Sequence, residues 1–253
     1  MRFPGGKTML IDGGGFADSS FDMGKLVVAP FLYSERISKI DIVVLSHPHP
    51  DHLNGLLYIT DNFDVQEVWS TGLRLDNENF RQWEKIISQK KIKVNYLSSQ
   101  SPPKEINGVQ VNILWPLKPL KVDATEQFYD MVNDESMVIK IKYNRVSFLM
   151  PADISTSVEK LLIRSGQNLH SDVLFVPHHG SSRSSSPDFI RKVACHSALI
   201  SAGINNPFHH PAPSTIKRLS EAKVNILRTD RDGAITVTTD GTKIAVDTYM
   251  KQR

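Results

Sequence analysis

The stretch Leu-Ser-His-Pro-His-Pro-Asp-His-Leu-Asn-Gly, residues 45–55, is the most informative part of this chain. It follows an apolar run, residues 40–45, which is typical of a buried strand. Its two prolines disfavour helical backbone angles in the residues that precede them, so the segment is predicted to be extended. A helix is expected to start near Asp51, with its N-terminal amides facing the segment.

Metal-ligating side chains are concentrated in this stretch, within six positions: His47, His49, Asp51 and His52. Alternate residues of an extended chain point the same way, so His47 and His49 can bind one ion together. Asp51 and His52 lie just beyond and can serve a second ion about 3.5–4 Å from the first. The alternative is a polar loop of solvated histidines, but so many polar groups at a strand end would carry a desolvation cost. The pattern therefore predicts a metal site.

The chain resembles the metallo-β-lactamase superfamily, whose signature is the His-x-His-x-Asp-His of residues 47–52. The flanking sequence, residues 46–55, looks most like the ComEC branch, the DNA-uptake proteins of natural competence. The resemblance covers most of the chain. It implies an α+β fold, a four-layer αβ/βα sandwich of two packed mixed sheets with outer helices and the site at one edge of both sheets. We expect residues 1–253 to form a single domain of this kind.

The composition agrees with a soluble globular protein, with 253 residues and 40% hydrophobic content. No apolar run approaches the roughly 18 residues needed to cross a bilayer, and no signal peptide is evident. Only Met1, Arg2 and Phe3 precede the turn at Pro4-Gly5-Gly6, too few for a good strand, so a full first strand is expected to be missing. The single cysteine, Cys195, excludes an internal disulfide and a cysteine-type metal site. A net charge of +3 permits an anionic substrate without indicating nucleic acid.

Hydrophobic periodicity predicts alternating strands and helices along the chain. The expected strands are 7–11, 40–45, 65–69, 92–97, 109–115, 137–143, 146–150, 172–176 and 197–202, with three short strands after residue 222. The expected helices are 76–90, 155–165 and 214–222, with an interrupted helical pattern over 21–37.

Further metal ligands are expected directly after apolar strands. Asp153 follows such a run, and a carboxylate has two oxygens that can bridge two ions. The superfamily places its bridging aspartate here; the alternative is a helix N-cap, a role that Ser155 could fill instead. His178 and His179 match the family pattern His-His-Gly-Ser, and one of them should ligate the second ion. We favour His178, with His179 facing the substrate or supporting a ligand, although the order of the two stays open.

A segment in the middle of the chain also matches the ComEC branch. The superfamily often carries another histidine before the bridging aspartate, but no histidine lies between His52 and His170. This departure from the superfamily pattern argues against a true β-lactamase. The gap contains instead an Asn-Asp-x-Ser segment of ComEC type, whose polar residues could contact metal, water or substrate: Asn133, Asp134 and Ser136. Asp12, after the first strand, is either a turn former or, as the resemblance implies, a support for the metal site.

The charge of the site favours an anionic substrate. Two divalent ions with two carboxylates and one hydroxide leave a net charge of about +1. The segment after the paired histidines adds backbone amides, hydroxyls and a guanidinium that suit a phosphodiester: Gly180, Ser181 and Arg183. His210 matches a His-Pro of ComEC-like sequences and is expected to protonate the leaving oxygen or hold a phosphate; the alternative is a capping or surface histidine. His209 is a weaker candidate for contact with the substrate.

These patterns lead to a two-metal phosphodiesterase that degrades DNA, most simply single-stranded DNA. Asp51, Asp153 and His210 are its expected catalytic residues, and zinc or manganese its expected metal. The resemblance implies association with the membrane channel domain of a larger ComEC-like protein, at the extracytoplasmic face of the inner membrane. The alternatives are a hydrolase of a small phosphodiester, of phosphocholine or nucleotide type, and a non-catalytic DNA-binding module whose binding survives metal loss.

Overall fold

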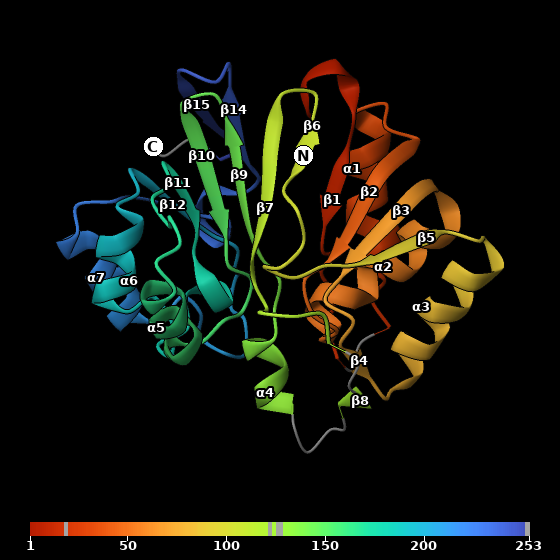
Figure 1. Ribbon diagram of the computed structural model, residues 1–253. Coiled ribbons are helices and arrows are strands. Elements are labelled where there is room, and N and C mark those ends of the chain that lie inside the picture. The colour runs from red at the N-terminus through yellow and green to blue at the C-terminus, as the bar shows by residue number, and fades with distance from the viewer. Residues whose placement is uncertain (18–19, 121–122, 125–128, 251–253) are drawn as a thin grey trace. The chain divides into compact units, whose positions relative to one another are not determined.

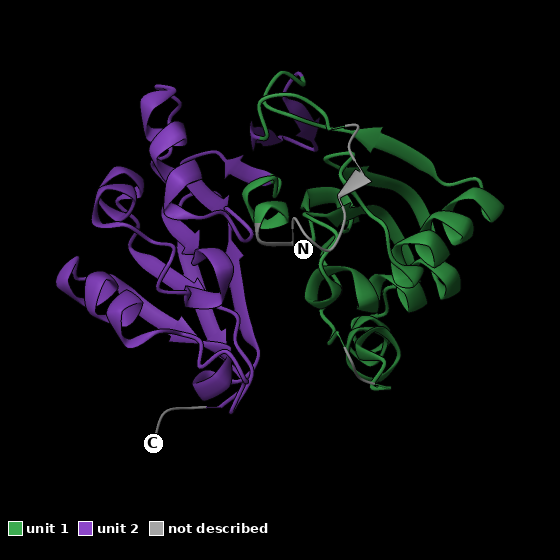
Figure 2. Ribbon diagram, turned by 90° about the horizontal axis from the view of Figure 1, so that it is seen from below, with its two compact units in different colours: residues 1–101, 116–137 green, residues 102–115, 138–253 purple. Residues whose placement is uncertain are grey.

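The computed structural model describes residues 1–17, 20–120, 123–124 and 129–250, and its chain divides into two compact units. Unit 1 comprises residues 1–101 and 116–137, and unit 2 comprises residues 102–115 and 138–253. Figure 1 labels the helices and strands, and Figure 2 colours the two units separately. The interpretation of the whole chain as one domain stays a prediction.

Unit 1 is built on a parallel sheet with the strand order β1-β2-β3-β5. The strands are β1 (Met9–Ile11), β2 (Lys39–Leu45), β3 (Asp64–Ser70) and β5 (Lys93–Tyr96). The helices are η1 (Pro4–Gly6), η2 (Gly24–Val28), α1 (Ala29–Ser34), α2 (Pro50–Asn62), α3 (Glu78–Gln89) and α4 (Tyr129–Asp134). A short pair, β4 (Arg74–Leu75) and β8 (Asp123–Ala124), completes the unit.

The core of unit 1 forms where α2 and α3 pack with the sheet. Apolar side chains of β2, β3 and both helices make one buried cluster, which includes Val43, Leu56, Val68 and Trp83. Trp83 Nε1 donates to Thr60 Oγ1 at 3.0 Å, so the polar end of the indole is satisfied inside this core. The sequence-predicted helix over 76–90 is confirmed, as is its apolar stripe.

Unit 2 contains a mixed sheet with the order β13-β12-β11-β10-β9-β7-β6. Its strands are β6 (Lys104–Ile106), β7 (Val109–Trp115), β9 (Val138–Tyr143), β10 (Val146–Met150), β11 (Val173–Phe175), β12 (Ser197–Ile200) and β13 (Asn225–Arg228). The four strands from β10 to β13 are parallel, and the other pairings are antiparallel. The remaining elements are α5 (Thr156–Arg164), η4 (Pro177–Gly180), α6 (Pro187–Val193), α7 (Pro213–Glu221), α8 (Thr229–Asp232) and the hairpin β14 (Ile235–Thr239) and β15 (Ile244–Thr248).

The parallel order in each sheet decides where polar residues gather. Because the carboxyl ends of parallel strands meet at the same edge, the turns after β1 and β2 are neighbours in unit 1. The turns after β10, β11 and β12 are neighbours in unit 2 for the same reason. The α+β class predicted from the sequence is confirmed, and Cys195 is buried in the core of unit 2 as expected.

None of the helices in the described ranges has the length and apolar character that a membrane span needs. The hydrophobic pattern does not predict α6, a helix of only seven residues that starts at a proline and is capped by the side chain of Ser186. The segment 116–133, for which the sequence predicts no helix or strand, contains β8 and most of α4 and lies partly outside the described residues, at 121–122 and 125–128.

Candidate metal centre

Three histidines of unit 1 pack together at the carboxyl end of β2. His47, His49 and His52 are all buried. The ring centroid of His47 lies 4.8 Å from that of His49 and 4.0 Å from that of His52. His47 Nε2 lies 3.2 Å from His49 Nδ1, and two nitrogens bound at about 2.0–2.1 Å to one tetrahedral ion would be about 3.3–3.4 Å apart. The chemistry and the spacing of this pair therefore fit one metal ion.

The helix α2 starts at Pro50, inside the stretch predicted to bind metal. His49 is its extended N-cap residue, and Pro50 suits the first helical position because its fixed φ is helical and it has no N–H to satisfy. Asp51 and His52 thus lie in the first helical turn, which confirms the helix predicted to start near Asp51. The predicted extended backbone is correct at His49 and wrong at Asp51. Asp51 Oδ2 lies 3.8 Å from His52 Nε2, and a carboxylate there is favoured by the helix dipole.

Asp12 lies in the turn after β1, and its carboxylate contacts the histidine turn. Its Oδ1 accepts from the backbone N–H of Ser46 at 2.8 Å, and its Oδ2 lies 2.8 Å from His52 Nδ1. Asp12 has a left-handed backbone with φ of 59°. Metal-ligating histidines usually donate their second ring N–H to a carboxylate or a carbonyl, so this contact agrees with the supporting role expected for Asp12.

Glycines let the turn after β1 and the helix η2 approach α2 closely. A Cβ on Gly55 would lie 2.0 Å from the carbonyl oxygen of Gly13, and a Cβ on Gly24 would lie 2.2 Å from that of Gly55. Gly13 N donates to His52 O at 2.7 Å, and Gly55 N donates to Gly14 O at 2.8 Å. This backbone-to-backbone packing brings the Asp12 carboxylate to His52, and the sequence analysis did not identify it.

The Asn-Asp-x-Ser segment also lies beside the histidine turn in unit 1. Met137 N donates to the carbonyl oxygen of Ser46 at 2.9 Å. Ser136 is fully buried, and Asn133 Oδ1 is buried with no hydrogen-bond partner among the described residues. The structure thus places the predicted substrate-contacting segment next to the predicted metal ligands of its own unit.

Asp153 and the paired histidines come together at the carboxyl ends of β10 and β11 in unit 2. Asp153 is buried, and its Oδ2 lies 3.9 Å from His178 Nε2 and 3.6 Å from His179 Nε2. Ser155 caps α5 through its side chain, so the N-cap alternative for Asp153 is wrong. Both histidines have left-handed backbone angles, with φ of 52° and 53°. Residues in this sparsely populated backbone region are frequent at active sites, although turns elsewhere in this chain also contain them.

The two histidines of this pair differ in their second ring nitrogen. His179 Nδ1 lies 2.9 Å from the backbone carbonyl oxygen of Ser201. Because a carbonyl oxygen can only accept, His179 Nδ1 carries the hydrogen and Nε2 presents its lone pair on the side of Asp153. This is the arrangement expected of a metal-ligating imidazole.

His210 lies near His178, with 5.8 Å between the ring centroids. Asn206 holds its backbone, because the Asn206 side chain accepts from His210 N at 2.9 Å and donates to His210 O at 2.6 Å. The peptide bond from His210 to Pro211 is cis. Ala212 is the N-cap of α7, and no side chain caps it, so the capping alternative for His210 is wrong. His209 is exposed.

The loop after η4 is tied to two helices of unit 2. Thr215 Oγ1 donates to Ser181 O at 2.8 Å, and Arg218 Nη2 donates to Ser184 O at 2.8 Å. Thr156 N donates to Arg183 O at 3.0 Å, while the Arg183 side chain is exposed. The loop backbone is therefore fixed, and the guanidinium predicted to contact substrate extends from it.

Glu159 of α5 anchors the same loop and gives it a pH dependence. Its buried carboxylate accepts from the backbone N–H groups of Ser185 and Ser186, and burial raises its pKa above the ordinary value of 4.5. The folded state thus binds this proton more tightly than the unfolded state, so stability falls as pH rises from 4.5 towards the folded-state pKa.

Replacing Glu159 by glutamine leaves one backbone N–H facing the side-chain amide N–H and should lower the free energy of unfolding by about 1–3 kcal/mol. We expect the stability gap between wild type and variant to be widest below pH 4.5 and to narrow above it, as measured by urea unfolding; a gap that widens with pH would contradict this.

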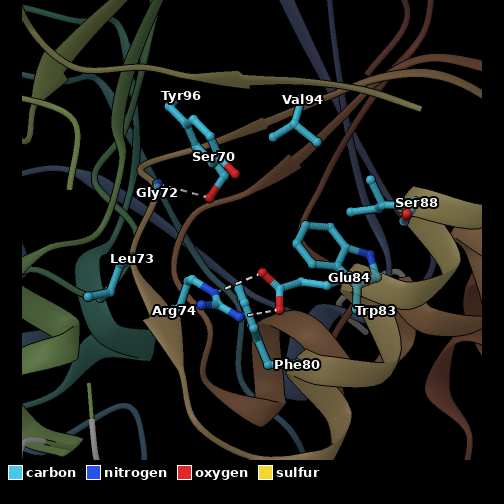
Figure 3. Close-up of a pocket in the computed structure, with 11 residues that line it drawn as sticks. Ser70, Gly72, Leu73, Arg74, Phe80, Trp83, Glu84, Ser88, Val94 and Tyr96 are labelled. Atoms are coloured by element: carbon cyan, nitrogen blue, oxygen red, sulfur yellow. Dashed lines mark hydrogen bonds and ion pairs between the residues drawn. The ribbon is translucent and has the colours of Figure 1, made fainter. Parts of the chain in front are cut away.

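A separate hollow lies between α3 and the ends of β3 and β5 in unit 1 (Figure 3). Its volume is about 190 Å³, below the roughly 300–1,000 Å³ of common small-molecule sites. Phe80 and Trp83 contribute to its apolar lining, and Arg74 pairs with Glu84 through two contacts of 2.7 and 2.8 Å. None of the predicted metal-binding or substrate-binding residues lines it.

The family of this chain is established by comparison with known proteins. Residues 2–203 match the metallo-beta-lactamase superfamily, so the chain belongs to that superfamily. The resemblance inferred from the sequence is thereby confirmed. The fold, with its mixed α/β units, and the histidines after β2 agree with this assignment.

Among individual relatives, the chain is similar to proteins of bacterial competence. It is 26% identical to the ComE operon protein 3 of Bacillus subtilis over 219 residues, which is 85% of this chain and 26% of the relative. It is 26% identical to the competence protein ComA of Neisseria gonorrhoeae, over 85% of this chain and 28% of the relative. The chain thus spans about a quarter of the length of these relatives. Among solved structures, CmlA, a diiron β-hydroxylase from Streptomyces venezuelae, has a similar fold, with a TM-score of 0.53 and 14% identity over 88% of this chain and 49% of CmlA.

Proposed function

We propose that this protein is a metal-dependent phosphodiesterase that degrades DNA. The observation that carries the proposal is the buried cluster of three imidazoles tied to Asp12, in a chain similar to competence proteins. Three imidazoles packed this closely in a protein interior would be costly if they were charged, whereas neutral imidazoles are good metal ligands. Superfamily membership supports a hydrolase.

The ligands proposed for two divalent ions are the imidazoles and carboxylates expected from the sequence. His47, His49 and Asp153 would hold one ion, and Asp51, His52, Asp153 and one of the paired histidines the other. Bound divalent ions would activate water as a nucleophile and stabilise charge on a phosphoryl group. Imidazole and carboxylate ligands suit zinc, manganese and iron alike, and zinc or manganese is proposed here.

Of the paired histidines, His179 is the better candidate for the ligand. Its Nδ1–H donates to the carbonyl oxygen of Ser201, and its Nε2 lies 3.6 Å from Asp153 Oδ2. His178 Nε2 lies slightly farther from the same oxygen, at 3.9 Å, and His178 is a ring neighbour of His210. We therefore assign His178 and His210 to the substrate, although the sequence analysis favoured His178 as the ligand.

The substrate would be held and protonated by residues of this chain. His210 is proposed to deliver a proton to the leaving oxygen, because a histidine near neutrality can act as a general acid. The exposed guanidinium of Arg183 can bind a phosphate oxygen, with Gly180 and Ser181 beside it in the fixed loop. The segment with Asn133, Asp134 and Ser136 is also proposed to contact the substrate, and His209 is a weaker candidate.

The relatives suggest the biological setting. Because they are competence proteins, we propose that the activity serves DNA uptake and that single-stranded DNA is the substrate. We further propose that the hydrolase works beside a membrane channel domain of a ComEC-like protein, at the extracytoplasmic face of the inner membrane. A chain that matches about a quarter of its relatives leaves room for such a partner domain in them.

The direct test is cleavage of end-labelled single-stranded DNA by the purified chain. We expect cleavage with manganese or zinc and complete loss of cleavage after EDTA, because the nucleophile depends on the metal. Metal content is measured on the same preparation.

Other outcomes would overturn the proposal in different ways. Hydrolysis of small phosphodiesters such as phosphocholine esters, without cleavage of DNA, would establish the small-substrate alternative. DNA binding that persists in EDTA and weakens steeply with salt, without cleavage, would establish a non-catalytic binding module.

A further inference from the structure

Ser46 lies at the centre of the histidine cluster, one residue before His47. Its side chain is buried, with 1% of the residue exposed. Ser46 Oγ lies 2.8 Å from Asp12 Oδ2, 3.1 Å from His47 Nδ1 and 3.3 Å from His52 Nδ1. We propose that Ser46 is a positioning residue that fixes the tautomer and orientation of two metal-ligating imidazoles at once, a role that rests on the metal site of the proposed function.

The hydrogen-bond donors and acceptors around Ser46 determine the tautomer of His47. The Asp12 carboxylate can only accept, so the single hydroxyl hydrogen of Ser46 goes to Asp12 Oδ2. Ser46 Oγ then has only lone pairs left, and His47 Nδ1, at 3.1 Å, must carry a hydrogen to bond with it. In this neutral tautomer His47 Nε2 carries no hydrogen. It is the nitrogen that lies 3.2 Å from His49 Nδ1.

The tautomer of His52 follows from its hydrogen-bond acceptor in the same way. Its Nδ1 lies 2.8 Å from Asp12 Oδ2, which again can only accept, so Nδ1 carries the hydrogen and Nε2 is bare. Ser46 also supplies its backbone N–H to the other carboxylate oxygen, Asp12 Oδ1, at 2.8 Å. Ser46 thus holds both oxygens of Asp12, and through them it sets the position of the acceptor that orients His52.

These contacts give Ser46 a role beyond packing in the core. An alanine at this position keeps the backbone bond to Asp12 but removes the acceptor for His47 Nδ1 and one of the donors to Asp12. His47 is then expected to populate the other tautomer, with Nε2 protonated and unable to ligate. Loss of such outer contacts to metal ligands typically costs about 10–100-fold in metal affinity.

The test combines metal affinity with a direct readout of the tautomer. Metal-free wild type, Ser46→Ala and Ser46→Thr are compared by ¹⁵N–¹H correlation of the imidazole nitrogens and by zinc titration against a competing chelator. We expect His47 and His52 to be protonated at Nδ1 in wild type, a shift of the His47 tautomer in Ser46→Ala, and a zinc affinity lowered about 10–100-fold. Ser46→Thr keeps the hydroxyl and should retain the His47 tautomer.

Ser98→Ala serves as the matched control, because Ser98 is also a fully buried serine of unit 1. This substitution is predicted to leave zinc affinity unchanged. Circular dichroism confirms that each variant is folded. An unchanged His47 tautomer or unchanged zinc affinity in Ser46→Ala would overturn the role of Ser46. If wild type binds no metal, the proposed function fails, and the tautomer spectrum of the metal-free chain still decides the role of Ser46.

Discussion

Replacing Gly55 by alanine is expected to destabilise unit 1 severely and to lower its metal affinity. Alanine should favour a helix by about 1 kcal/mol over glycine, and Gly55 lies inside α2. The added Cβ, however, would lie 2.0 Å from Gly13 O and 2.7 Å from Gly13 C, both backbone atoms that cannot rotate away. Overpacking usually costs about 1–3 kcal/mol where side chains can adjust, so we expect about 3 kcal/mol or more here.

The site should be lost together with the stability. If α2 moves away from Gly13, the hydrogen bonds from Gly13 N to His52 O and from Gly55 N to Gly14 O are broken. Asp12 would then separate from His52, whose Nδ1 it contacts at 2.8 Å. Urea unfolding measures the change in stability, and zinc titration below the unfolding transition measures the change in affinity.

The control for this prediction is Gly203→Ala. A Cβ on Gly203 meets no atom within 4 Å, and its φ lies outside the left-handed region. We expect its stability to differ from wild type by about 0.5 kcal/mol or less, as for most surface substitutions. A Gly55→Ala variant as stable as this control would mean that the close approach of Gly13 to α2 does not exist in solution.

Replacing Asp153 by asparagine is expected to lower DNA hydrolysis about a thousandfold while the chain stays folded. The bridging role proposed for Asp153 requires two charged oxygens, and asparagine offers one neutral oxygen in the same volume. Stabilisation of transition-state charge by bound ions amounts to several kcal/mol, and each 1.36 kcal/mol corresponds to about a tenfold change in rate. Metal content should fall in parallel.

The matched control is Asp188→Asn, in α6 of the same unit. Asp188 is 71% exposed and pairs with Arg191 on its own helix, so its charge should contribute little to stability or to the site. Cleavage of labelled DNA, metal content and thermal unfolding are measured for both variants. Wild-type cleavage by Asp153→Asn would refute the bridging role, whereas loss of cleavage with full metal content would assign Asp153 to substrate binding.

The sequence by itself determined the family. The run from His47 to His52 after an apolar strand carries the signature of the superfamily, and the superfamily match confirms that resemblance. Most strands and the longer helices were also predictable, because each carries its own hydrophobic period. The short α6 was missed because seven residues that start at a proline give little periodic signal. The roles of individual site residues stay predictions.

The tertiary structure decided which atoms face one another. Asp12 contacts Ser46 and His52, which lie 34 and 40 positions away, and no local pattern encodes such a pairing. The ring nitrogen of His179 that carries the hydrogen follows from the carbonyl oxygen of Ser201, which belongs to another strand end. The physical reason is the same in each case: residue spacing fixes which groups a segment presents, whereas hydrogen-bond partners depend on backbones brought together by the sheet.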